Sequence, residues 1–335
     1  MIGICLIGCG RAGLIHARNF VNKVPGASLV ALADPIPEAL KAASEELGVT
    51  QCYADYREAL ARDDVHAVVV VSPTKYHCEI VVAAANAGKH VFCEKPLAMT
   101  EEECDQMIAA AEANRVKLQV GFMRRFDESF MAAKEMIDAG EIGDVVLVKS
   151  HTRGPSTPKP WMYDIRKSNG PLAEVNSHDI DTLRWFTGSE FESLYAVGGN
   201  YRCPEAAKEF HDFYDNVLMN VTFANGAQGC IDGAQGVGYG YDAETEILGT
   251  KGVIHVGRTQ ERFITSCSRD GVLKTPYMTS WRKLFVEAYL AEDRHFVDCI
   301  LSGEAPRVTG LDGKMVVRIV NAGNLSIVEK RIVRL

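Results

Sequence analysis

Short apolar segments alternate with longer amphipathic ones along the first third of the chain. The apolar segments lie at residues 4–7, 29–33, 67–71, 90–93 and 118–120. Between them, helical spacing of apolar residues is found at 12–24, 37–47, 56–61, 77–87 and 101–114. Nearly continuous apolar strands that alternate with helices are typical of a parallel sheet buried on both faces. The pattern predicts a doubly wound α/β domain over residues 1–122.

The pattern changes from about residue 123. A helix is predicted at 128–139, a strand at 145–151 and a second helix at 172–186. Strand patterns then follow one another at 191–198, 216–223, 227–234, 242–248 and 253–256, and helical segments near 281–302 and 311–329 end the chain. Consecutive strands with little helix between them favour a mixed or antiparallel sheet. Residues 123–335 are therefore expected to form a second, α+β domain with an open, largely antiparallel sheet.

Composition limits the class of partner. The chain has 335 residues, a net charge of −8 and 47% hydrophobic residues, as an ordinary globular protein of two domains does. An acidic surface argues against nucleic acid or an anionic membrane as the partner. The most apolar stretch, 67–71, is far shorter than the roughly 20 residues of a membrane span. A small-molecule partner is expected.

The cysteines indicate a reducing compartment. The ten cysteines are scattered and form no C-x-x-C, and Cys5, Cys93 and Cys299 lie in apolar runs, where free cysteine behaves as a small hydrophobic residue. Met1 leads directly into a strand without the features of a signal peptide. We expect a cytoplasmic protein without disulfides or a metal site.

The first strand-to-helix turn carries a phosphate-binding pattern, Gly8-Cys9-Gly10-Arg11-Ala12-Gly13. Gly8 permits a tight turn, Gly10 lets the backbone approach a pyrophosphate, and Gly13 lets the helix pack close to the strand. The helix N-terminus offers N–H groups to the phosphates. The second strand ends at Asp34, whose carboxylate can accept hydrogen bonds from ribose hydroxyls. Together these features predict a Rossmann domain that binds a dinucleotide.

The residues around Asp34 favour NAD over NADP. The carboxylate would repel a 2′-phosphate, and Pro35 and Ile36 provide no cation to hold one. NAD is therefore the predicted cofactor.

Two more strand ends carry polar residues on the carboxyl edge of the sheet, where ligands of such sheets bind. The first cluster contains Ser72, Thr74 and His77, and the second is Glu94-Lys95-Pro96. Alternatively, Ser72 and Thr74 cap the next helix, and His77 is an ordinary residue of its first turn. Lys95 is held between Glu94 and a proline, which predicts a rigid place at the cleft.

In the second domain, Glu174 and His178 stand four residues apart in the helix predicted at 172–186. On a continuous helix this spacing places both on one face, where a carboxylate can orient an imidazole that acts as a general base. The alternative is a structural histidine. Asp179 and Asp181 would point elsewhere around the helix, so a metal site is not expected.

These motifs together resemble the Gfo/Idh/MocA oxidoreductases, and within them the inositol 2-dehydrogenases. The resemblance covers essentially the whole chain. It is carried by the glycine turn, Ser72 to His77, Glu94-Lys95-Pro96, Gly121-Phe122-Met123-Arg124-Arg125-Phe126-Asp127 and Glu174-x-x-x-His178-Asp179-Ile180-Asp181. It implies a Rossmann domain followed by an open mixed sheet, through which such proteins commonly form dimers or tetramers.

The resemblance implies roles for three residues. Lys95 would bind both the nicotinamide ribose side and the reacting hydroxyl, and His178 would remove the hydroxyl proton. The family's usual residue four positions before the histidine is Asp, whereas this chain has Glu174. This departure leaves the identity of the substrate open.

The resemblance also suggests further ligands. It places substrate contacts at His151, Arg153 and Tyr241, and Arg153 stands where the inositol branch commonly has Asn. Met123 and Arg124 are expected to line the cleft. Trp281 and Tyr289 match positions near the nicotinamide.

Three functions remain open at this point. The first is NAD-dependent oxidation of a cyclic polyol, with myo-inositol as the first candidate. The second is oxidation or reduction of a pyranose or glycoside, which Arg153 and Glu174 favour. The third is a non-catalytic dinucleotide-binding regulator, but such a sensor has no need of Lys95, Glu174 and His178.

Overall fold

The computed structural model describes residues 1–257, 260–261 and 264–335. These form two compact units, Met1–Phe126 with Glu287–Arg318, and Asp127–Val286 with Ile319–Leu335. A continuous second domain over 123–335 does not match this division, because the segment Glu287–Arg318 belongs to the first unit. No helix within the described residues has the length and apolarity needed to cross a membrane.

The first unit contains a six-stranded sheet of order β3-β2-β1-β4-β5-β6, and every paired strand in it is parallel. Its strands are β1 (Ile2–Ile7), β2 (Ala27–Ala33), β3 (Cys52–Tyr53), β4 (Ala67–Val70), β5 (His90–Glu94) and β6 (Leu118–Gly121). This is the strand order of dinucleotide-binding domains, and it reverses between β1 and β4, beside the glycine turn. The predicted doubly wound fold is confirmed. The short strand β3 was not predicted.

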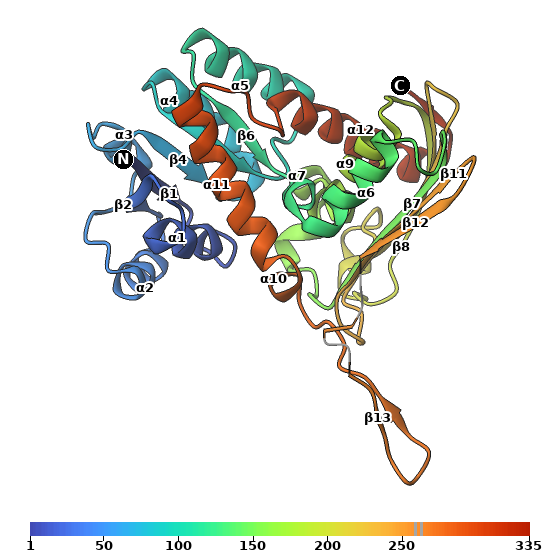
Figure 1. The fold of residues 1–335 in the computed structure, drawn as a ribbon. Coiled ribbons are helices and arrows are strands. Elements are labelled where there is room, and N and C mark those ends of the chain that lie inside the picture. Colours follow the sequence, from blue (N-terminus) through green and yellow to red (C-terminus); the bar gives the residue numbers. More distant parts are fainter. Residues whose placement is uncertain (258–259, 262–263) are drawn as a thin grey trace. The chain divides into compact units, whose positions relative to one another are not determined.

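Helices connect these strands, as Figure 1 shows. They are α1 (Gly13–Asn22), α2 (Pro37–Leu47), α3 (Tyr56–Leu60), α4 (His77–Asn86) and α5 (Glu101–Ala113). A capping box fixes the start of α5, because Thr100 Oγ1 accepts from the Glu103 N–H while the Glu103 carboxylate accepts from the Thr100 N–H.

Helix α11 (Val286–Ser302) returns to the first unit near the end of the chain. Its residues Leu290, Phe296 and Val297 join a buried cluster that includes Leu6 and Phe92. The Phe296 ring meets the Phe92 ring edge-on at 5.9 Å between centroids. Burying one such side chain contributes about 1.5–3 kcal/mol, so α11 is part of this unit's core.

The second unit contains a seven-stranded sheet of order β12-β11-β7-β10-β9-β8-β15. Its strands are β7 (Val145–Gly154), β8 (Phe191–Gly199), β9 (Asn216–Phe223), β10 (Gln228–Gln235), β11 (Asp242–Gly249), β12 (Val253–Gly257) and β15 (Val333–Arg334). Strands β7 and β10 pair in parallel, and the other pairs are antiparallel. The prediction of an open, mixed, largely antiparallel sheet is confirmed.

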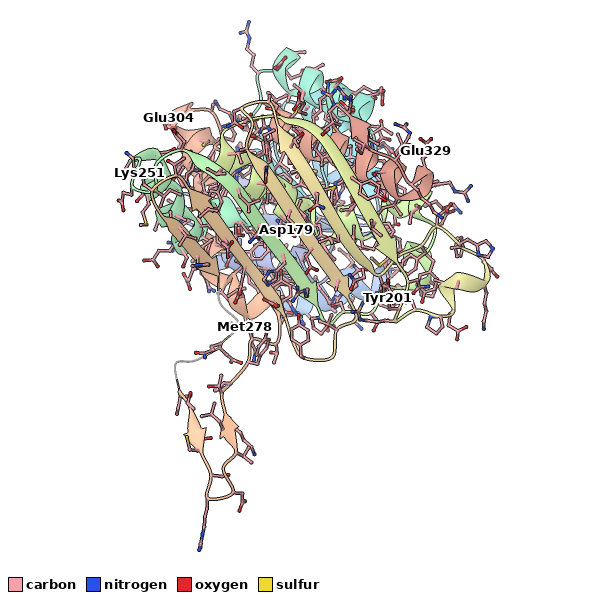
Figure 2. The ribbon with its side chains drawn as sticks, turned by 90° about the vertical axis from the view of Figure 1, so that its right-hand side faces the viewer. Asp179, Tyr201, Lys251, Met278, Glu304 and Glu329 are labelled. Carbon is pink, nitrogen blue, oxygen red and sulfur yellow. The ribbon has the colours of Figure 1, made fainter. Side chains whose placement is uncertain are left out.

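One face of this sheet is covered by helices and the other is exposed. In β9, buried Val217 and Met219 alternate with exposed Leu218, as expected for a sheet with one solvated face. The helices of the unit are α6 (Glu128–Asp138), α7 (Ile165–Ser168), α8 (Gly170–Glu174), α9 (Ser177–Thr187), α10 (Trp281–Leu284) and the second half of α12 (Gly310–Glu329). In Figure 2 the sheet lies in front of helices of its own unit. A hairpin of β13 (Ser266–Cys267) and β14 (Leu273–Lys274) projects from the unit.

The predicted continuous helix over 172–186 is wrong. Helix α8 ends at Glu174, and α9 begins at Ser177 after Asn176, whose backbone has φ −90° and ψ 1°. The Asn176 side chain packs directly on β10, where a Cβ added to Gly233 would lie 1.9 Å from Asn176 Oδ1. Tertiary packing at Asn176 therefore accompanies a break that periodicity alone does not reveal.

The burial of Phe296 on α11 predicts how much its replacement lowers the free energy of unfolding. Phe296→Ala removes a fully buried ring from the first unit and should lower the free energy of unfolding by about 3–5 kcal/mol. Leu301→Ala, on the same helix at 59% exposure, is the control and should change it by less than about 0.5 kcal/mol. Urea denaturation measures both. Equal, small effects would show that α11 is not part of the core.

Candidate active site

The glycine turn has the geometry of a phosphate cradle. Gly8 has φ +105°, and a Cβ there would lie 2.6 Å from the Val71 carbonyl oxygen. A Cβ on Gly13 would lie 2.0 Å from the Gly8 carbonyl oxygen, so α1 starts in direct contact with the turn. A Cβ on Gly10 would meet nothing within 4 Å. The backbone at Gly10 is therefore open to a ligand, and the start of α1 has no side-chain cap.

Asp34 is held in place by the same turn. Its Oδ2 accepts from the Cys9 N–H at 2.7 Å, and its Oδ1 accepts from the Ile36 N–H at 2.9 Å. The side chain is nearly buried at the end of β2. Each carboxylate oxygen retains a further lone pair, which can accept from a ribose hydroxyl. These residues fit the adenosine side of NAD. Arg11 is exposed and Ala12 half-buried in the turn.

The loop after β4 has one polar atom that lacks a partner. Ser72 Oγ is buried and has no hydrogen-bond partner among the described residues, as expected of a group that binds a ligand. Thr74 begins a 3₁₀ turn and is half-buried. His77 was predicted to bind the cofactor, but its ring contacts two carbonyl oxygens, those of Ser72 at 2.7 Å and Pro96 at 2.9 Å. Burial lowers the pKa of His77. The ring thus links the two strand-end loops.

The turn that carries Lys95 follows β5. Glu94 is buried, and its Oε2 accepts from the Lys95 N–H at 2.9 Å, while its Oε1 lies 3.2 Å from His16 Nε2. The Glu94 carboxylate thus contacts protein groups, which favours a positioning role over the cofactor contact we predicted. Lys95 is half-buried at the carboxyl end of the strand. Its position suits an ammonium group that acts at the cofactor edge.

In the second unit, His178 lies in the first turn of α9 and is almost buried. Glu174 is the last residue of α8. Because the two helices are separate, the expectation that both residues share one helix face fails. Their pairing remains a proposal that rests on the family motif.

Asp179 anchors the helix that carries His178. It is fully buried and accepts from Ser150 Oγ at 2.6 Å, Thr152 Oγ1 at 3.0 Å and Asn176 Nδ2 at 2.8 Å. These contacts fasten α9 to β7. Sequence reasoning missed this role, although the alternation of Val148, Ser150 and Thr152 marks the helix-facing side of β7.

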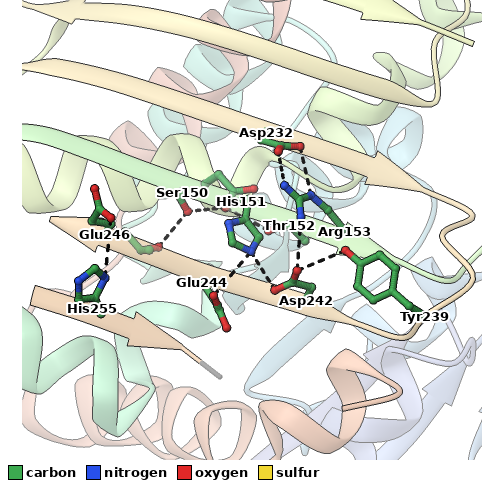
Figure 3. A network of polar contacts seen from close by, with 12 residues as sticks. Ser150, His151, Thr152, Arg153, Asp232, Tyr239, Asp242, Glu244, Glu246 and His255 are labelled. Atoms are coloured by element: carbon green, nitrogen blue, oxygen red, sulfur yellow. Dashed lines mark hydrogen bonds and ion pairs between the residues drawn. The ribbon is translucent and has the colours of Figure 1, made fainter. Parts of the chain in front are cut away.

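The same alternation decides where His151 and Arg153 point. Side chains of successive strand residues lie on opposite faces, so both lie on the face away from α9. There, His151 Nε2 lies 2.8 Å from Asp242 Oδ1, and Arg153 forms an ion pair with Asp232, as Figure 3 shows. Although burial lowers it, the Asp242 carboxylate raises the pKa of His151 above its ordinary value. The geometry argues against our prediction that these residues contact a substrate beside His178.

Tyr241 lies on the other side of the sheet. Asp242 pairs with Arg153, so Tyr241 stands opposite Gly154, and a Cβ on Gly154 would lie 3.6 Å from its ring. Tyr241 is buried and its N–H donates to the Met278 carbonyl. It therefore lies on the face that α9 covers, as the predicted role requires. Gln235, which pairs with Gly154, was missed: its Oε1 is buried without a partner among the described residues.

The remaining predicted residues lie in a turn after β6 and on helices α10 and α11. Met123 and Arg124 lie in a 3₁₀ turn after β6, in the first unit, and both are about 1% exposed. Tyr289 is also buried there, and its ring meets the His16 ring at 5.4 Å. Trp281 begins α10 and is half-buried.

Comparisons with known proteins agree with this fold. Residues 2–122 match the model of the oxidoreductase family with an NAD-binding Rossmann fold, and residues 130–255 match the GFO/IDH/MocA C-terminal domain. The first unit is thus that of an NAD-binding oxidoreductase, as predicted. The chain belongs to the GFO/IDH/MocA family.

Relatives of similar length support this assignment. Myo-inositol 2-dehydrogenase of Thermotoga maritima is 36% identical over 99% of this chain and 98% of its own. The scyllo-inositol 2-dehydrogenase (NAD(+)) of Bacillus subtilis is 34% identical over 94% of this chain and 90% of its own. The structure of scyllo-inositol dehydrogenase from Lactobacillus casei with NAD(H) and scyllo-inositol superposes with a TM-score of 0.91 at 31% identity, and covers 100% of this chain and 99% of that one.

Cofactor preference follows from the environment of Asp34. Asp34→Ser combined with Pro35→Arg should weaken NAD binding by about 10–100-fold, because the carboxylate that can accept from ribose hydroxyls is removed, and should strengthen NADP binding. Asp34→Ser alone, the control, should lose NAD affinity without this gain. Isothermal titration calorimetry measures both. Wild-type protein that binds NADP as tightly as NAD would contradict the role of Asp34.

Proposed function

We propose that this protein oxidises a secondary hydroxyl of a cyclic polyol of the inositol type, with NAD as the hydride acceptor. The observation that carries the proposal is full-length similarity to inositol dehydrogenases in a chain that keeps Lys95 and His178 at the motif positions. The scyllo-inositol bound in the Lactobacillus casei structure supports the same class of substrate.

The reaction needs a group that takes the hydroxyl proton and a group that stabilises the alkoxide. His178 is proposed as the base, with Glu174 orienting its ring and stabilising the imidazolium. The Lys95 ammonium stabilises the negative charge that develops on the oxygen. NAD, when bound, accepts the hydride. Tyr241 and Gln235, on the helix-facing side of the second sheet, are proposed to hold the ring hydroxyls.

A pyranose or glycoside is the alternative substrate. Glu174 favours it, because this residue is one methylene longer than the family's usual Asp and changes the space beside the base. Arg153 no longer supports this alternative, because it points away from α9 and pairs with Asp232.

We also propose that the exposed face of the second sheet joins copies of the chain into dimers or tetramers. Val197 and Leu218 are adjacent across β8 and β9 and about half exposed, and Leu248 and Val253 are 41% and 48% exposed on β11 and β12. Apolar side chains gathered on one sheet face are typical of an interface. The proposal of a cytoplasmic location rests on the cysteines, all of which are free thiols.

The proposed function predicts which variants lose turnover. Wild-type protein should form NADH, followed by its absorbance, with an inositol in preference to the sugars and glycosides of a test panel. Lys95→Met should lower kcat by about 100–1,000-fold, because it removes charge stabilisation in the transition state. NAD binding should change little. Lys208→Met, a control at an exposed lysine, should keep wild-type turnover.

Two results would overturn this assignment. Turnover of Lys95→Met within a few-fold of wild type would reduce Lys95 to a structural residue. A preference for a glycoside would select the alternative substrate.

The pH dependence tests His178. A base must be deprotonated to act, so the rate of oxidation should rise with pH through the range in which an imidazole titrates, ordinarily near 6.5. His178→Ala should lose this limb and most activity. Glu174→Gln should lose rate, because an amide does not stabilise an imidazolium, whereas Glu174→Asp should retain the limb. If His178→Ala kept the wild-type rate and pH profile, the base would be another group, with Tyr241 the next to test.

A further inference from the structure

A buried polar cluster lies beneath the Lys95 turn, inside the first unit. Its ionisable members are His16 on α1, Glu94 at the end of β5, and Glu292 and Asp293 on α11. Three of the four are 0% exposed and Glu94 is 6% exposed. Charged side chains are seldom buried unless they are paired, so the cluster needs a physical explanation.

The contacts form one chain that ends at the backbone of Lys95. The Lys95 N–H donates to Glu94 Oε2 at 2.9 Å, and Glu94 Oε1 lies 3.2 Å from His16 Nε2. On the other side of the ring, His16 Nδ1 lies 2.7 Å from Asp293 Oδ1. Asn19 Nδ2 donates to Asp293 Oδ2 at 2.8 Å. Helices α1 and α11 are thus connected to the turn through a single imidazole.

The two carboxylates define the charge on His16. A neutral imidazole has one N–H, whereas both ring nitrogens here face a carboxylate oxygen, so the ring is an imidazolium that donates on both sides. Burial lowers the pKa of His16, but Asp293 and Glu94 more than offset this and raise it well above its ordinary value. The Phe92 and Tyr289 rings pack against the imidazole and exclude water from it.

Glu292 completes the charge balance. Both of its carboxylate oxygens are buried without a hydrogen-bond partner among the described residues. One ligand atom from each of His16, Glu94 and Glu292 lies within 4.8 Å of the others. Burial raises the pKa of Glu292 well above its ordinary value; the His16 charge lowers it, and the Glu94 and Asp293 charges raise it. The raised pKa favours the protonated form of Glu292, which avoids a third adjacent anion.

We propose that His16 is a positioning residue for Lys95: by donating to Glu94 and Asp293 it fixes the lysine turn to α1, the helix that starts at the cofactor-binding glycine turn. The inference rests on the proposed function in taking Lys95 as the catalytic residue. The Gly13 backbone begins α1 three residues before His16, so the helix whose N-terminus faces the phosphates also holds the turn that bears the ammonium.

A second contact fixes the other side of the turn. The Pro96 carbonyl lies 2.9 Å from His77 Nδ1, and the same ring contacts the Ser72 loop. The backbone is thus held on one side of Lys95 by His16, through Glu94, and on the other side by His77, through the Pro96 carbonyl. Misplacement of a catalytic group by about 1 Å can cost 100-fold in rate, so these anchors bear directly on turnover.

The test compares His16→Gln with Glu292→Gln. His16→Gln removes the rigid ring that donates to both carboxylates, and should lower kcat by about 10–100-fold with a much smaller change in the KM for NAD. Glu292→Gln introduces a neutral amide of the same shape as the protonated acid and should keep kcat within about twofold. With the polyol deuterated at the reacting carbon, the isotope effect on kcat should increase in His16→Gln only, because hydride transfer becomes slower.

Hydrogen exchange provides a readout that needs no turnover. The Lys95 amide should exchange at least about tenfold faster in His16→Gln than in wild type, measured by mass spectrometry on a peptide that begins several residues before Lys95, such as one over residues 90–99. Glu292→Gln should leave its exchange unchanged. A wild-type rate of exchange in His16→Gln would overturn the positioning role. If wild type oxidised no polyol, the proposed function would fail, whereas exchange would still decide the role of His16.

Stability against pH tests the proton on Glu292. Its pKa is raised on folding, so above the ordinary value of 4.5 the native state holds a proton that the unfolded state has lost, and wild-type stability declines as pH rises. Glu292→Gln should remove this part of the decline and raise Tm relative to wild type at pH 8 more than at pH 5. A stoichiometric metal ion in native wild-type protein, or equal loss of kcat in both variants, would contradict the account.

Discussion

A parallel sheet is stable when both of its faces are covered, and this constraint organises the first unit. Helices α1 to α5 and α11 provide the cover, and the alternation of strand and helix brings the carboxyl ends of β1, β2, β4 and β5 to one edge. The glycine turn, Asp34, Ser72 and Lys95 each follow one of those strands. The site is thus a consequence of how the sheet is buried, and local hydrogen bonds then fix its details.

The sequence predicts those parts of the structure that depend on local pattern. The buried strands, the glycine turn, Asp34 and Lys95 could be placed because each follows an apolar run with a recognisable turn. The break at Asn176 could not, because it coincides with packing against Gly233 on another element, which periodicity does not reveal. The alternation of residues along β7 can be read from the sequence. To infer from it that His151 and Arg153 lie on the face away from α9, one must also know which face of the sheet α9 covers.

The cluster around His16 shows a second limit of sequence reasoning. His16 and Asp293 are 277 positions apart and meet because α11 returns to the first unit. No local pattern distinguishes Glu292 and Asp293 from the solvated acids of an amphipathic helix. Their burial, together with that of Glu94, places residue types that are usually found on the surface beneath the Lys95 turn, which we propose they support. The proposed catalytic groups can be read from motifs, whereas the groups proposed to hold them in place emerge only from the fold.

Transfer of a hydride from the polyol to NAD is the central claim, and isotope transfer tests it most directly. The protein would be incubated with NAD and an inositol deuterated at the carbon that bears the reacting hydroxyl, and the NADH would be analysed by mass spectrometry. The account predicts one deuterium in each NADH molecule formed. NADH without deuterium, or no NADH from any inositol, would contradict it.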